Sequence, residues 1–324
     1  MSFNMRHWAW LARNGHIEAP PMDLAPFPFA VMTDAEENQL HEDLKRWGYL
    51  QEGVLTDDAR YLLDSIAHTN VLTIRGLVLL YSKKTNAVKE FDTKDDEFDL
   101  VKAVRDIPRV PFTITVTDSE IITAINTLPA LMVTRHQRRG DIATQVGPIL
   151  KTILDPKDEW EPWQSTPVTI PFRLTQDIVN DKELSEIIFD EDRVFNDGED
   201  SDDTATIVRD THAEARRKKQ AKETQQLLSR AEVPAYTAEK LGNLVGQRTI
   251  QTVILAITYS TVQGVVEPDA STGIMYFEEA GTVVSYAKGR SPETRSIRYV
   301  PGDDQGFIEG VRALINLADP PKRR

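Results

Sequence analysis

The stretch GIMYFEEAGTVVSYAKGRSPETRSIRYVPGDDQGFIEGVRALINLADPP, residues 273–321, decides the fold of this 324-residue chain. Its first part predicts a β-hairpin and a third strand near Ile297–Val300, because alternating β-branched and aromatic residues are typical of strands. A Pro-Gly pair ends that strand, and Asp303 or Asp304 stands where a helix N-cap belongs. A Pro-Pro pair ends the helix. Its expected apolar face recurs at helical spacing and consists of Phe307, Ile308, Val311, Leu314, Ile315 and Leu317.

A similar strand–Asp–helix pattern occurs earlier, in VPFTITVTDSEIITAINTLP, residues 110–129. Its first part alternates apolar residues with threonine, which predicts a half-buried strand. Asp118 follows at the position of an N-cap, and the apolar residues after it fit one helix face: Ile121, Ile122, Ile125 and Leu128. Both copies come after an apolar run, Leu72–Tyr81 in one case and Ile250–Tyr259 in the other. The chain is therefore expected to consist of two related halves.

These patterns predict a mixed α/β (α+β) fold with a central, largely antiparallel sheet, flanking helices and two related halves. The run around Gly76 is apolar on both faces, which suits a central strand covered by other elements. A segment rich in Pro and Trp, Pro156–Pro167, is expected to connect the halves. We therefore predict an N-terminal half over 1–155 and a C-terminal half over 156–324. The second half would carry a helical insertion over roughly 174–247, and both would form one continuous globular unit.

Composition narrows the classes of function. The net charge of −13 argues against broad binding to nucleic acid or to anionic membranes, both of which need a basic surface. Two basic runs, Arg135–Arg139 and Arg216–Lys219, are expected to be solvated segments, with phosphate binding as the alternative. The chain has no cysteine, no apolar run of about 18 residues and no signal-peptide pattern at its start. We therefore expect a cytoplasmic protein without membrane insertion.

Motifs for catalysis and for cofactors are missing from the sequence. It contains no phosphate loop, dinucleotide fingerprint, H-E-x-x-H motif or nucleophile elbow. Capping of helices is the favoured role of Asp118 and Asp303. The six histidines are scattered without metal-ligand spacing. We predict a binding protein that is not an enzyme and needs no cofactor. The alternatives are an enzyme with a dispersed site, for example Asp118, Asp303 and His136, and a nucleic-acid-associated regulator.

The acidic segment Glu183–Asp203 raises the question of calcium. An EF-hand loop needs oxygen ligands at its first, third and fifth positions and glycine at the sixth. Gly198 at the sixth position would place Arg193 and Phe195 at the first and third. The pattern therefore does not fit, and we expect a solvated segment with no metal.

Four pieces of the chain, in order, resemble the EspG family, the cytoplasmic chaperones of the mycobacterial ESX (type VII) secretion systems. The first two lie before residue 81: Thr33-Asp-Ala-Glu-Glu…Leu44…Trp47-Gly48, then Leu55…Leu62-Leu63…Ile66-Ala67 followed by Val71–Leu80. The other two are Val168-Thr-Ile-Pro, which opens the second half, and the closing block Gly273–Ala318. The chain differs from typical members in its greater length and in the acidic insert Asp190–Asp203.

The resemblance implies a cytosolic chaperone without catalytic residues, built from two pseudo-twofold-related halves. Its implied partners are secreted PE–PPE-like helical-hairpin proteins, which it would keep soluble and target for export. Such a partner needs an apolar surface of about 800 Å² per side. The candidate partner-binding residues lie in the helical part of the second half: Leu227, Leu228, Val233, Tyr236, Leu241, Leu244 and Val245. The alternative is that they pack on the sheet. We expect a monomer or a weak homodimer.

Overall fold

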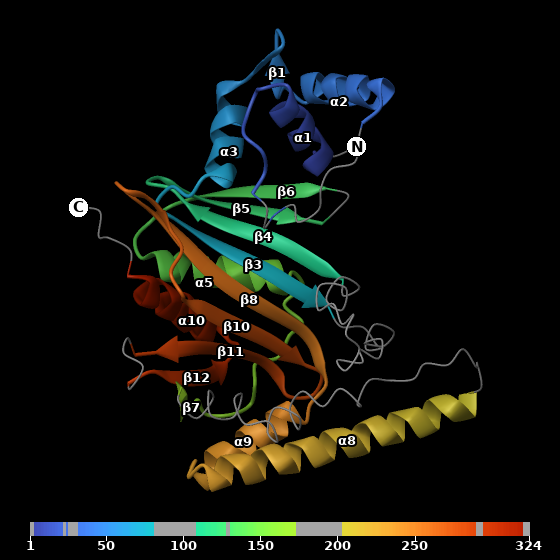
Figure 1. Cartoon of the computed structure of the whole chain (residues 1–324), viewed down its shortest axis with the longest axis vertical. Coiled ribbons are helices and arrows are strands. Elements are labelled where there is room, and N and C mark those ends of the chain that lie inside the picture. Colours follow the sequence, from blue (N-terminus) through green and yellow to red (C-terminus); the bar gives the residue numbers. More distant parts are fainter. Residues whose placement is uncertain are drawn as a thin grey trace, which may run out of the picture.

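Two long strands lie at the centre of the molecule (Figure 1). In the computed structural model, β3 (Leu72–Leu80) and β8 (Thr249–Thr261) run antiparallel, with Leu72 opposite Tyr259 and Leu80 opposite Gln251. They are the two apolar runs that the sequence pattern predicted. The structure describes residues 3–21, 24, 32–80, 108–127, 130–172, 203–289 and 294–319, and only the backbone over 203–216.

The strands on either side of this central pair repeat the same order. From β3 the sheet continues through β4 (Arg109–Val116), β5 (Glu120–Asn126) and β6 (Leu131–Gln137). From β8 it continues through β10 (Ser271–Phe277), β11 (Gly281–Lys288) and β12 (Ser296–Pro301), with β7 (Val168–Pro171) at the edge and β9 (Gly264–Val266) paired to β8. These neighbours pair antiparallel in a 10-stranded sheet. The predicted mixed fold with two pseudo-twofold-related halves is confirmed.

One helix follows the last repeated strand of each half. α5 (Ile142–Leu154) follows β6, and α10 (Asp304–Ala318) follows β12. Each begins at an aspartate N-cap, since the backbone N–H of Thr144 donates to Asp141 and that of Gly306 donates to Asp303. The two helices pack on each other and on the same face of the sheet, behind the strands in Figure 1. The predicted cap before the closing helix is therefore confirmed at Asp303.

The predicted helix after Asp118 is wrong, because these residues form strand β5. Thr117 and Glu120 close a tight turn in which the Thr117 N–H donates to the Glu120 carbonyl at 2.8 Å. Ile121 then packs into the core under α5 and α10, and Ile122 into the core on the opposite face. Adjacent apolar residues fit a strand that is buried on both faces as well as they fit a helix. The true counterpart of the closing unit is therefore β6–Asp141–α5.

Two further groups of helices cover opposite ends of the other face of the sheet (Figure 1). At the β6 end lie α1 (Met5–Arg13), α2 (Asp34–Arg46) and α3 (Asp57–Ala67), with the small hairpin β1 (Leu50–Gln51) and β2 (Val54–Leu55). At the β7 end lie α8 (Asp203–Arg230) and α9 (Ala235–Val245). Residues 174–202, the first part of the predicted helical insertion and almost all of the acidic segment, lie outside the described residues. The division of the chain at residue 155 stays a prediction.

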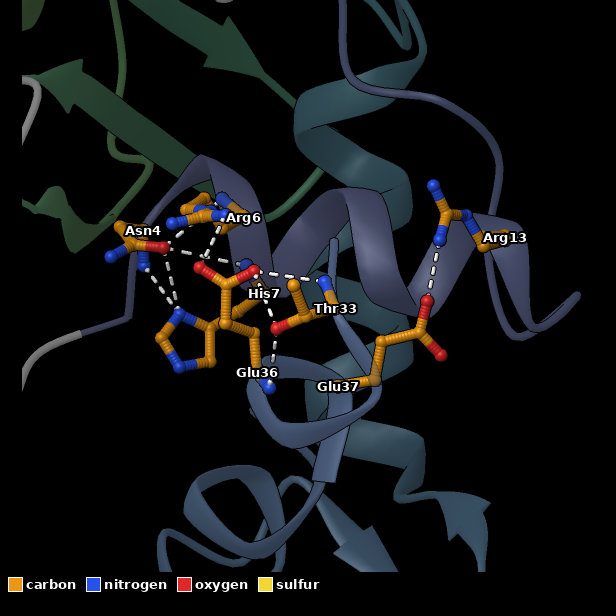
Figure 2. A network of polar contacts seen from close by, with 7 residues as sticks. All are labelled: Asn4, Arg6, His7, Arg13, Thr33, Glu36 and Glu37. Atoms are coloured by element: carbon orange, nitrogen blue, oxygen red, sulfur yellow. Dashed lines mark hydrogen bonds and ion pairs between the residues drawn. The ribbon is translucent and has the colours of Figure 1, made fainter. Parts of the chain in front are cut away.

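The helices of the N-terminal group are joined by polar contacts at their surface. Figure 2 shows Arg6 and Arg13 of α1 paired with Glu36 and Glu37 of α2. Glu36 also forms a capping box with Thr33 at the start of α2, since its carboxylate accepts from the backbone N–H of Thr33 at 2.9 Å. Beneath these contacts, side chains of α1, α2 and α3 bury an apolar cluster that includes Trp8, Leu11 and Leu44. This cluster rests on β5 and thereby fixes the group on the sheet.

Candidate partner-binding surface

The two faces of the central strands differ in how they are covered. On β8, Val253, Leu255 and Ile257 are almost fully buried in the core beneath α5 and α10. Side chains alternate between the faces of a strand, so Ile254 points to the opposite face. Ile254 is 54% exposed, although it lies in the middle of a central strand. The middle of this second face is therefore accessible to a partner.

The neighbours of Ile254 extend this accessible area across three strands. Leu77 of β3 lies opposite Ile254, and Leu79 lies opposite Thr252. On the other side, Met275 of β10 lies opposite Thr252. Leu77, Leu79 and Met275 are half-buried. We call these four apolar residues, Leu77, Leu79, Ile254 and Met275, the central strip.

Gly273 lies directly beside Ile254 on β10 and leaves space in the central strip. A Cβ atom at Gly273 would come within 2.7 Å of the Ser285 hydroxyl oxygen, so a side chain there would require the Ser285 side chain to move. A glycine within a strand often marks a place where another chain approaches closely. The surface next to Ile254 therefore consists of apolar side chains and, at Gly273, of a position without a side chain, which leaves room for a partner.

Helical layers border the central strip on both sides. α3 packs on β4 and β5, whereas α9 packs on β7. α9 ends at Val245, and residues 246–248 lead from it directly into β8. The chain therefore connects one helical layer to the strand that carries Ile254.

The structure separates the seven predicted partner-binding residues into two groups. Five are buried within this protein: Leu227, Leu228, Val233, Leu241 and Leu244. All but Leu227 belong to the cluster under α9, where they meet Trp163, Ile170 and Phe277. Packing on the sheet, the alternative that the sequence left open, therefore accounts for these four. Tyr236 and Val245 are 49% and 38% exposed and accessible to a partner.

Tyr236 is held in a defined position at the start of α9. Its hydroxyl is hydrogen-bonded to the hydroxyl of Thr166 at 2.7 Å, and this bond lowers the pKa of Tyr236. The ammonium group of Lys240 lies 5.5 Å from the centre of its ring. Such an anchored aromatic side chain loses little conformational freedom when it binds a partner.

The residues of the alternative enzyme site are divided between the two halves. Asp118 lies in the turn between β4 and β5, whereas Asp303 caps α10 in the other half. His136 is exposed on β6. In the described ranges, no group of three or more His, Asp or Glu residues is placed to hold a metal ion. Arg135, from the first basic run, is paired with Asp58 at 2.8 Å and with Glu120 at 3.1 Å.

Comparison with solved structures shows a similarity that extends over the whole chain. No protein-family model matches the sequence, and no curated protein sequence matches it. Among solved structures, the chain is similar to the Mycobacterium tuberculosis type VII secretion system chaperone EspG5, in complex with a PE25-PPE41 dimer. The similarity covers 100% of this chain and 98% of that chain, with a TM-score of 0.64 and 11% sequence identity. This chain has the fold of EspG5.

The resemblance to the EspG family that the sequence patterns indicated is thus confirmed for the fold. At 11% identity the similarity concerns the course of the backbone over the whole chain. Within the described part of the chain, no helix has the length and apolar character needed to cross a membrane.

Proposed function

We propose that this chain is a cytoplasmic chaperone that binds helical secretion substrates of the PE–PPE kind. It would keep them soluble and target them for export, without catalysis and without a cofactor. The observation that carries the proposal is the EspG5 fold over the whole chain, since EspG5 was solved with a PE25-PPE41 dimer. The chain itself would act as a monomer or a weak homodimer.

The surface chemistry supports this function. A helical hairpin exposes apolar side chains at its tip, and these need an apolar site that excludes water. The central strip offers such a site around Ile254, which is 54% exposed. Met275 of the strip packs against the cluster beneath α9. That helix carries the exposed Tyr236 and Val245, and aromatic residues are common anchors at interfaces. We assign the central strip, Tyr236 and Val245 to the substrate surface.

Co-expression tests the function directly. The chain would be produced together with helical secretion substrates that are encoded beside its own gene. We expect one of them to copurify as a stable complex and to gain solubility relative to its expression alone. If none copurifies and none becomes more soluble, the proposal fails.

A pair of matched variants tests the surface. Ile254→Glu places a charge in the middle of the central strip and should weaken substrate binding by about 2 kcal/mol, roughly 30-fold in Kd. Met132→Glu is the control, because Met132 is also 54% exposed but lies on edge strand β6. Titration calorimetry on the two folded variants gives both affinities. Equal affinities would show that the substrate binds elsewhere.

A further inference from the structure

A pocket lies on the face of the sheet opposite the central strip. It opens between α10 and the strands β11 and β12 and has a volume of about 440 Å³. The side chains that matter for its chemistry are Tyr286, Lys288, Arg298, Glu309, Arg312 and Leu317. Tyr286 belongs to the core beneath α5 and α10, which places the pocket on that face. The proposed substrate surface does not include it.

One wall of the pocket is apolar and fixed. The Tyr286 hydroxyl donates to Glu309 at 2.9 Å, and the Gln305 amide donates to the other carboxylate oxygen of Glu309 at 3.1 Å. Burial raises the pKa of Tyr286 to about 12, so its hydroxyl stays neutral. Leu317 on α10 is half-buried beside the pocket. The wall therefore presents an aromatic ring and aliphatic groups in fixed positions.

The rest of the pocket is cationic. Lys288, Arg298 and Arg312 line it together with a single carboxylate, that of Glu309. Arg312 is paired with Asp141 at 2.9 Å. Arg298 interacts with the Tyr286 hydroxyl, and no ion pair of Lys288 or Arg298 is found among the described residues. Two cations thus face a concave site on a chain whose net charge is −13.

We propose that this pocket binds a small organic anion, with a phosphate or carboxylate group attached to an aromatic or aliphatic body. The anionic group would lie against Arg298 and Lys288, because a guanidinium group binds such oxygens through two parallel hydrogen bonds. The body would lie against Tyr286 and Leu317. A ligand with both parts matches both walls, whereas a neutral ring or a bare ion matches only one.

Four simple probes test the proposal: phenyl phosphate, benzoate, phenol and inorganic phosphate. Each is titrated at millimolar concentration into the full-length protein, with calorimetry and backbone amide NMR as readouts. We expect phenyl phosphate or benzoate to bind more tightly than phenol and inorganic phosphate, and to shift the amides of Gly289 and Ala313. The stronger of the two shows whether phosphate or carboxylate is preferred.

Variants assign the binding to the cations. Arg298→Met should weaken the binding of the tighter probe by roughly 10- to 100-fold in Kd, the range for the loss of a hydrogen bond to a charged group. Lys288→Met, at an exposed position, should weaken the binding of this probe as well. It replaces Arg298→Met in the test if Arg298→Met does not fold. Arg6→Met, on the far helix α1, is the control and should bind as wild type does.

Two results would overturn the proposal. One is the absence of binding of phenyl phosphate and benzoate alike. The other is equal binding of a probe by wild type, Arg298→Met and Lys288→Met. Ile254→Glu should bind the probes normally, so a failure of the proposed chaperone function and a failure of this site remain distinguishable.

Discussion

At the scale of single residues, the most unusual feature is a buried pair of titratable groups in the N-terminal helices. His7 of α1 and Asp43 of α2 are both about 1% exposed, and their nearest polar atoms are 3.8 Å apart. Gln39 donates to one Asp43 oxygen at 3.0 Å, whereas the other oxygen and the His7 Nε2 have no hydrogen-bond partner. Arg46 also donates to the Asp43 oxygen that Gln39 contacts, so the carboxylate is shared and compensates a charge on His7 only in part.

This environment predicts a loss of stability in mild acid. Burial lowers the pKa of His7 below its ordinary value of 6.5, against the opposing effect of Asp43. The folded state thus binds fewer protons than the unfolded state, so stability is full above pH 6.5 and falls as the pH drops below it. The slope is at most about 1.4 kcal/mol per pH unit. Urea unfolding of wild type at pH 7.5 and 5.5 measures it.

The His7→Gln variant should remove this part of the pH dependence, whatever its effect on stability at neutral pH. His136→Gln, at an exposed histidine on β6, should leave the pH dependence as in wild type. A pH slope that persists in His7→Gln would assign it to other groups. No pattern in the sequence distinguishes His7 from the other histidines, because its burial results from contacts with the distant residues Asp43 and Trp47.

At the scale of elements, the aspartate caps distinguish the predicted repeat from the observed one. Asp303→Ala removes the bond to the Gly306 N–H, which is 2.7 Å long, and should destabilise the protein by about 1 kcal/mol. Asp118→Ala should cost clearly less, because Asp118 is exposed in a turn and precedes a strand. Urea denaturation of the two variants compares them. Equal losses would contradict the assignment of caps.

The sequence predicted most elements because their signals are local. The capping box before α2, the apolar run of β3 and the Asp–helix unit at α10 all follow from neighbouring residues. β5 was missed because Ile121 and Ile122 belong to two different cores, and that depends on layers supplied by distant parts of the chain. The central strip was missed for a related reason. Ile254 lies within a continuous apolar run that gives no sign of which face a helix covers.

The packing of α8 on α9 depends on two glycines spaced one helical turn apart. A Cβ at Gly242 would come within 2.7 Å of the Ala221 carbonyl oxygen, and one at Gly246 within 2.7 Å of the Ala221 Cβ. Gly242→Leu should therefore push the helices apart and cost about 1–3 kcal/mol. Asn243→Leu, at an exposed neighbouring position, should cost less than about 0.5 kcal/mol. Thermal unfolding of both variants measures whether the close contact between α8 and α9 stabilises the protein.

At the scale of the whole molecule, two contacts join the pseudo-twofold halves. The first is the pairing of β3 with β8 along their length. The second is the packing of α5 on α10, where Gly147 lies against Ile308. A single apolar core contains residues of both halves. The halves should therefore unfold together, because neither can bury its side of this core alone.

Gly147→Leu tests this cooperation. A Cβ at Gly147 would lie 2.9 Å from the backbone nitrogen of Ile308 and 2.8 Å from its Cγ1, so α10 cannot stay in place beside a larger side chain. We expect a loss of about 1–3 kcal/mol. Native-state hydrogen exchange should show the loss equally in β5 and in β11, which lie on opposite sides of the central pair. Thr152→Leu, on the exposed side of α5, should change neither strand. Weakened protection in β11 with unchanged protection in β5 would instead mean that the two halves are independent folding units.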